Sequence, residues 1–162
     1  MAKEKFSIEQ FLETVDTGYQ AFIQNLHNYL TDNGCKVTVE KKKSGFFASY
    51  KYVKLKRSIV NLLFRKKRLI VRIYGENVNK YLDFMNTLPE EMVQSIEEAT
   101  VCKRLIDPEA CSPTCPKGYD FSMGNKHFQV CRYGAFEFPI TNKNNSYIKS
   151  FVEKEIKERT AV

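Results

Sequence analysis

Hydrophobic residues recur at intervals of three and four over residues 7–32. This spacing predicts one long amphipathic helix with a single buried stripe. Ser7, followed by Gln10 three residues later, has the pattern of a capping box at the helix start. The pair Asn33-Gly34 has the residue types that end helices in a left-handed conformation. The chain therefore begins with a long helix that ends near residue 33.

From residue 35 to 74 the hydrophobic period changes to two, and β-branched and aromatic residues become frequent. This pattern predicts strands. A hairpin is expected around the four cations Arg65-Lys66-Lys67-Arg68, which would form its tip. The four expected strands cover residues 35–40, 46–53, 58–64 and 69–74.

The second half of the chain returns to helical spacing and then mixes both periods. It predicts helices over 78–88, 89–99 and 147–159, a hairpin of 119–123 with 126–133, and a strand over 135–140. This order excludes the regular alternation of a doubly wound parallel sheet. We expect an α+β fold, in which residues 1–162 form a single domain with an antiparallel sheet, a long N-terminal helix, two middle helices and a C-terminal helix.

Positive charge is concentrated in the strand-rich segment. The whole chain has a net charge of +7, and residues 35–74 contain thirteen Lys or Arg residues but only one acid, Glu40. That segment is therefore 13 − 1 = +12, and the rest of the chain is 7 − 12 = −5. Such an asymmetry favours binding to an anionic partner. The alternative is that these lysines bind no partner and only form a solvent-exposed face that keeps the protein soluble.

The cations in this segment are interleaved with the aromatic residues Phe46, Phe47, Tyr50 and Tyr52. Cations can hold backbone phosphates, and aromatic faces can stack on unpaired bases, so nucleic acid is the favoured partner. Packing of the aromatic rings in the core is the alternative. The predicted partner-binding residues are Lys41, Lys42, Lys43, Lys51, Lys54, Lys56, Arg57, Arg65, Lys66, Lys67 and Arg68.

Four of the five cysteines fall within residues 102–131. Cys102, Cys111, Cys115 and Cys131 are separated by eight, three and fifteen residues. The C-x-x-x-C pair is typical of zinc ligands, so we expect a structural zinc site with four cysteine ligands, and an iron–sulfur cluster is the less favoured alternative. His127 is on the same strand face as Cys131 but about 13 Å away along an extended chain, which favours Cys102 as the fourth ligand.

Other functions remain open for these cysteines. They can be independent small hydrophobic residues of the core, or they can take part in redox or disulfide chemistry. A small-molecule-binding or thiol redox-sensing domain is therefore the alternative function. The chain contains none of the common phosphate-loop, dinucleotide, zinc-protease or serine-hydrolase motifs, which favours a non-catalytic binding module.

The first twenty residues carry four acids and lack the apolar run of a secretory signal. No segment has the roughly 20 apolar residues that span a bilayer. We therefore expect a cytoplasmic protein without a membrane partner. The sequence does not indicate an oligomeric state.

Overall fold

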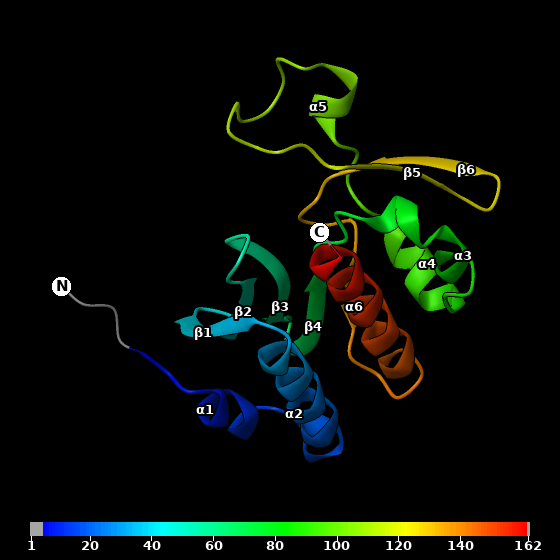
Figure 1. Cartoon of the computed structure of the whole chain (residues 1–162). Coiled ribbons are helices and arrows are strands. Elements are labelled where there is room, and N and C mark those ends of the chain that lie inside the picture. Colours follow the sequence, from blue (N-terminus) through cyan, green and yellow to red (C-terminus); the bar gives the residue numbers. More distant parts are fainter. Residues whose placement is uncertain (1–4, 162) are drawn as a thin grey trace.

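The computed structural model describes residues 5–161 and has an α+β fold, as the sequence predicts. Five antiparallel strands form the main sheet in the order β1-β2-β3-β4-β7, and β5 and β6 form a separate two-stranded sheet (Figure 1). The strands of the main sheet are β1 (Cys35–Lys42), β2 (Gly45–Tyr52), β3 (Arg57–Arg65), β4 (Arg68–Ile73) and β7 (Glu137–Pro139), and the small sheet consists of β5 (Tyr119–Met123) and β6 (Lys126–Val130).

The predicted hairpin of 58–64 and 69–74 is present as β3 and β4. Arg65 is paired with Arg68, so the turn itself contains only Lys66 and Lys67. Both lysines have left-handed backbones, with φ of 54° and 64°. Two consecutive left-handed residues give the turn a twist that matches the twist of the strands. Two of the four cations predicted for a loop tip thus form the turn, and the other two are the last pair of the ladder.

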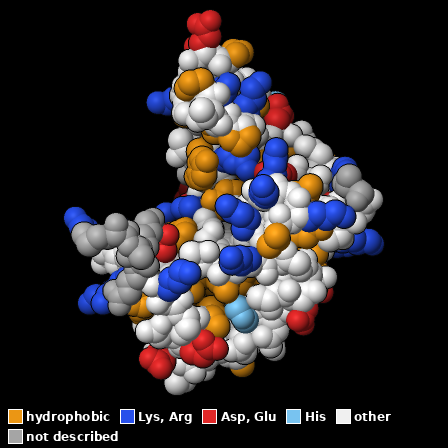
Figure 2. Space-filling model, turned by 60° about the vertical axis from the view of Figure 1, so that its left-hand side comes forward, with side chains coloured by type: hydrophobic (Ala, Val, Ile, Leu, Met, Phe, Trp, Pro, Cys, Tyr) orange, Lys and Arg blue, Asp and Glu red, His pale blue; other side chains and the backbone are white. Residues whose placement is uncertain are grey.

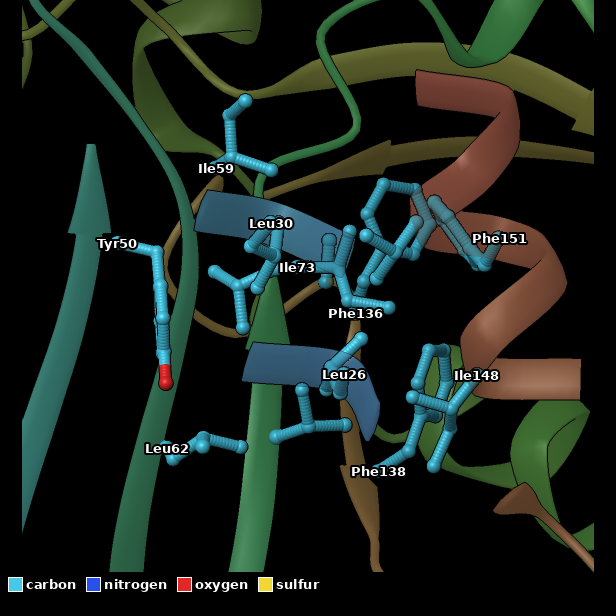
Figure 3. Close-up of a cluster of buried hydrophobic side chains, with 14 of the residues drawn as sticks. Leu26, Leu30, Tyr50, Ile59, Leu62, Ile73, Phe136, Phe138, Ile148 and Phe151 are labelled. Atoms are coloured by element: carbon cyan, nitrogen blue, oxygen red, sulfur yellow. The ribbon is translucent and has the colours of Figure 1, made fainter. Parts of the chain in front are cut away.

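The hydrophobic core lies on one face of the main sheet, beneath α2 (Thr17–Asp32) and α6 (Asn145–Thr160) (Figure 1). Figure 3 shows side chains from both helices meeting those of the strands in one cluster. It contains Leu26, Leu30, Ile148 and Phe151 from the helices, Tyr50, Ile59, Leu62, Ile73 and Phe138 from the strands, and Phe136 from the residue before β7. Strand alternation places Lys36, Thr38, Glu40, Phe47, Ser49 and Lys51 on the opposite face of β1 and β2, which we call the outer face.

The N-terminal helix is interrupted, contrary to the prediction of one helix over 7–32. It forms α1 (Ile8–Glu13) and α2, with a break at residues 14–16. The capping box of Ser7 and Gln10 is present as predicted. Gln20 of α2 donates hydrogen bonds to the carbonyl of Leu12 in α1 and to the carbonyl of Val15 within the break. The break lets both helices place apolar residues against the sheet, a requirement that periodicity alone does not reveal.

The middle helices are shorter than predicted. The helix expected over 78–88 is a 3-10 turn, η1 (Val78–Lys80), followed by the short helix α3 (Leu82–Met85). The next predicted helix is present as α4 (Glu90–Glu97), and α5 (Lys103–Ile106) was not predicted. Within residues 5–161, the helices are all too short or too polar to cross a membrane.

A buried ion pair on α6 connects this helix to the rest of the fold. Glu155 and Arg159 are one helical turn apart, and their side chains are 0% and 2% exposed. Glu155 accepts hydrogen bonds from the backbone and side chain of Asn77 and from the hydroxyl of Tyr81. Arg159 donates to Glu155 over 2.8 Å and to two backbone carbonyls of the main-sheet region. The pair therefore fixes the C-terminal helix against η1 and the sheet.

Candidate anion-binding site

The outer face contains a concavity of about 540 Å³. Its size falls within the range of pockets that hold drug-sized ligands, about 300–1,000 Å³. Lysine side chains, hydroxyl groups and two apolar side chains surround it. The lining residues are Lys36, Thr38, Glu40, Phe47, Ser49, Lys51, Val53 and Lys56.

Strand alternation and register place the lysines of this concavity. Lys36 of β1 lies directly opposite Lys51 of β2 in the antiparallel ladder. Lys56 follows in the β2–β3 turn, where its backbone is left-handed with φ of 53° and its amide donates to the carbonyl of Val53. Within the described residues 5–161, these three lysines form no ion pair with an acid. Glu40 also lines the concavity, and it forms an ion pair of 3.5 Å with Lys42.

Lys36 and Lys51 carry like charges at directly opposite positions of the β1–β2 ladder. Directly opposite side chains on neighbouring strands have Cβ atoms about 4.5–5.5 Å apart, and like charges at such positions are destabilising. A bound anion between the two ammonium groups would reduce this repulsion. Sequence reasoning missed Lys36, because its position opposite Lys51 depends on the strand register.

The structure divides the eleven predicted partner-binding cations into two groups. Four of them are in or beside the β2–β3 turn, and seven are at the other end of the sheet, where the β1–β2 and β3–β4 turns lie. The first group is Lys51, Lys54, Lys56 and Arg57, and the second is Lys41, Lys42, Lys43, Arg65, Lys66, Lys67 and Arg68. Only Lys51 and Lys56 line the concavity.

The three predicted arginines already have acidic partners. Arg57 pairs with Glu76, Arg65 with Glu137 and Arg68 with Glu91, at distances of 3.0–3.4 Å. These arginine side chains are more than half exposed, so each pair contributes about 0–1 kcal/mol to stability. The lysines are therefore the cations most available to an anion.

Most of the interleaved aromatic residues are in the core instead of on the binding face. Tyr50 is 0% exposed and Tyr52 is 7% exposed. Phe46 is half-buried and packs edge-on against Phe6, with ring centroids 5.1 Å apart. Phe47 alone among the four predicted aromatics belongs to the outer face, where the Lys42 ammonium lies 5.1 Å from its ring centroid. The expected aromatic surface is thus reduced to one ring.

The cysteines do not form the predicted metal site. Among residues 5–161, which include all five cysteines, no group of three or more His, Cys, Asp or Glu side chains is arranged to hold a metal ion. This finding contradicts the function predicted from Cys102, Cys111, Cys115 and Cys131, a module built around a structural zinc site with four cysteine ligands. Whether the chain binds zinc or an iron–sulfur cluster at all stays a prediction from the sequence. All five cysteines are free thiols.

Hydrogen bonds shape the segment where a metal was expected. The Arg104 guanidinium donates to the carbonyls of Ser112 and Cys115, and the Gly118 amide donates to the Cys102 sulfur over 3.2 Å. These contacts close the 107–118 loop, which stands away from the main sheet together with α5 (Figure 1). The extended segment around Val101 pairs with the end of β6 and anchors the loop to the fold.

The individual thiols lie in different surroundings. Cys35 and Cys102 are buried, and Cys111 is exposed. Burial raises the pKa of the Cys35 thiol to about 11. Cys35 is therefore a protonated, unreactive residue of the core at neutral pH.

No protein-family model, curated protein or solved structure matches this chain. The outer-face concavity therefore has to be interpreted from its own geometry and charge.

Proposed function

We propose that this chain is a nucleic-acid-binding protein whose outer face holds backbone phosphates. The observation that carries the proposal is the direct opposition of Lys36 and Lys51 at the concavity. Two lysines at opposite ladder positions, without an acidic partner among residues 5–161, concentrate positive charge at the concavity, and Lys56 adds a third cation. The hydroxyls of Thr38 and Ser49 can donate further hydrogen bonds to phosphate oxygens.

The cations at the other end of the sheet support the same function. Lys41, Lys43, Lys66 and Lys67 form no ion pairs within residues 5–161, and they extend the positive field beyond the concavity. Clustered charge of one sign increases the rate at which a polyanion encounters the protein. We propose that this second group steers the nucleic acid, while the lysines of the concavity hold it. A cytoplasmic location remains a prediction from the sequence.

The proposal is tested by measuring the affinity for a fluorescent oligonucleotide at several salt concentrations. Each phosphate contact contributes a slope of about −0.7 to −0.9 in a plot of log K against log salt. The triple variant Lys36→Gln, Lys51→Gln, Lys56→Gln should therefore bind more weakly and lose a slope of about 2. Its melting temperature should be equal to or above that of the unmodified protein, because the variant relieves lysine repulsion.

A second triple variant provides the matched control. Lys143→Gln, Lys154→Gln, Lys157→Gln removes the same number of charges from exposed positions in or before α6, on the helix-covered side of the sheet. This control should retain the slope and nearly all of the affinity. Absence of binding at the lowest salt concentration, or equal losses in the two variants, would refute the proposal.

A further inference from the structure

The β2–β3 turn exposes two aliphatic side chains in the most positively charged part of the chain. Val53 is 55% exposed and Leu55 is 45% exposed, and they alternate with Lys54 and Lys56. In the described part of the chain, five large hydrophobic residues are exposed, and these are two of them. Single exposed aliphatic residues are common. Val53 lines the cationic concavity and Leu55 follows in the same turn, so two aliphatic side chains are exposed next to the anion site.

Phe47 also lines the concavity, but it lies six residues from Val53, about 20 Å away along an extended strand, with Ser49 and Lys51 between them on the same face. Figure 2 shows one face of the molecule on which Lys and Arg side chains gather, with hydrophobic side chains exposed between them. A ligand that matches this arrangement needs negative charges and flat apolar faces at short intervals. Unpaired nucleotides have both, since each base exposes its π-face next to a phosphate.

A duplex fits the same surface poorly. Its base faces are stacked inside the helix, so it presents phosphates, sugars and groove edges to a protein. A duplex docked on the three lysines would leave the apolar groups against charged backbone or water. The concavity of about 540 Å³ is also of the size that holds a small ligand, so it can take only a short stretch of an unpaired strand.

We infer that the ligand of the outer face is single-stranded nucleic acid, with phosphates at Lys36 and Lys51, unpaired bases against Val53 and Leu55 at one end of the concavity, and a further base against Phe47 at the other end. The inference rests on the function proposed above and names its substrate class. Proteins that bind single strands without sequence preference stack successive bases on aromatic side chains, and aliphatic side chains can likewise cover the apolar face of a base.

The test compares one labelled sequence as single-stranded DNA, single-stranded RNA and duplex DNA, each titrated with the full chain. At least one single strand should bind about tenfold or more tightly than the duplex. The variant Val53→Ser, Leu55→Ser keeps every charge and removes apolar surface, so it should weaken single-strand binding about tenfold, with little effect on the duplex. Comparison of the affinities for single-stranded DNA and single-stranded RNA shows which of the two polymers the protein prefers.

A control variant, Val101→Ser, Ile106→Ser, changes two aliphatic side chains that are 52% and 66% exposed elsewhere on the molecule. It should bind every oligonucleotide as the unmodified protein does. Equal affinity for single strand and duplex, with no effect of the Val53 and Leu55 changes, would overturn the inference while leaving the phosphate site intact. Lack of binding to any oligonucleotide would refute the proposed function as well.

Discussion

Replacement of Arg159 by methionine should destabilise the protein more than any surface substitution. The change keeps much of the volume of the side chain but removes its charge and its hydrogen-bond donors. Glu155, which is fully buried, would then remain as an uncompensated carboxylate. The carbonyls of Ser58 and Tyr74 would also lose the donors that lie 2.9 and 2.7 Å away.

The expected loss follows from the burial of the pair. Breaking a buried ion pair by removing one partner costs about 3–5 kcal/mol in the free energy of unfolding. The whole domain is expected to have about 5–15 kcal/mol of stability. At about 2–4 °C per kcal/mol for a chain of this length, the melting temperature should fall by about 6–20 °C.

Urea unfolding followed by circular dichroism measures this loss, and tyrosine fluorescence gives a second signal because the chain has no Trp. The variant Lys157→Met is the control, since it removes an exposed charge from the same helix and should change stability by about 0.5 kcal/mol or less. The double variant Glu155→Gln, Arg159→Met should recover part of the loss, because the buried carboxylate is then absent while the carbonyls of Ser58 and Tyr74 still lack their donors. A loss below about 1 kcal/mol for Arg159→Met, or a double variant as unstable as the single one, would refute this account of the pair.

Two further predictions concern stability. Gly45→Ala should cost on the order of 1–3 kcal/mol, because φ is +133° and the new Cβ would lie 2.9 Å from the Phe64 ring. Gly18→Ala is the control; it lies in α2 with nothing within 4 Å of the new Cβ, and should stabilise by about 0.4–1 kcal/mol in urea unfolding. Burial lowers the pKa of His27 below its usual 6.5. The folded protein therefore binds this proton less readily than the unfolded chain, and stability should fall as the pH drops below about 6.5. His27→Gln should flatten this part of the stability–pH curve. If the curve of the variant is unchanged, protonation of His27, which contacts the Tyr50 hydroxyl, does not cause the loss of stability at low pH.

Local patterns in the sequence were sufficient for the strand-rich segment. Alternation over residues 35–74 placed Tyr50 and Tyr52 on one face and Lys51 on the other, as the structure shows. The same segment contains the excess positive charge, so the concentration of cations on these strands was predictable. The capping box at Ser7 was also predictable from the sequence, because it depends on two residues three positions apart.

Helix lengths were less predictable, because they depend on contacts with distant segments. The break at residues 14–16 allows α1 and α2 to pack separately against the sheet. The run Thr14-Val15-Asp16, followed by Gly18, has low helix propensity and was the available signal. Hydrophobic periodicity continued through it and concealed the break.

The cysteine spacing allowed a metal site but did not determine one. Whether four sulfurs converge depends on how the loop folds back, and here hydrogen bonds from Arg104 and to the Cys102 sulfur set its path. Spacing along a chain limits the distance between two side chains only when the backbone between them is regular, and residues 107–118 contain no helix or strand.

The sequence by itself determined the α+β class, the faces of the strands and the excess of lysines. Each of these follows from neighbouring residues, since strand alternation and charge need no information about distant parts of the chain. The tertiary structure decided which lysines act together, because register alone brought Lys36 opposite Lys51 and the β2–β3 turn placed Lys56 at the same concavity. An anion site requires charges that are close in space, and only the folded sheet sets that distance.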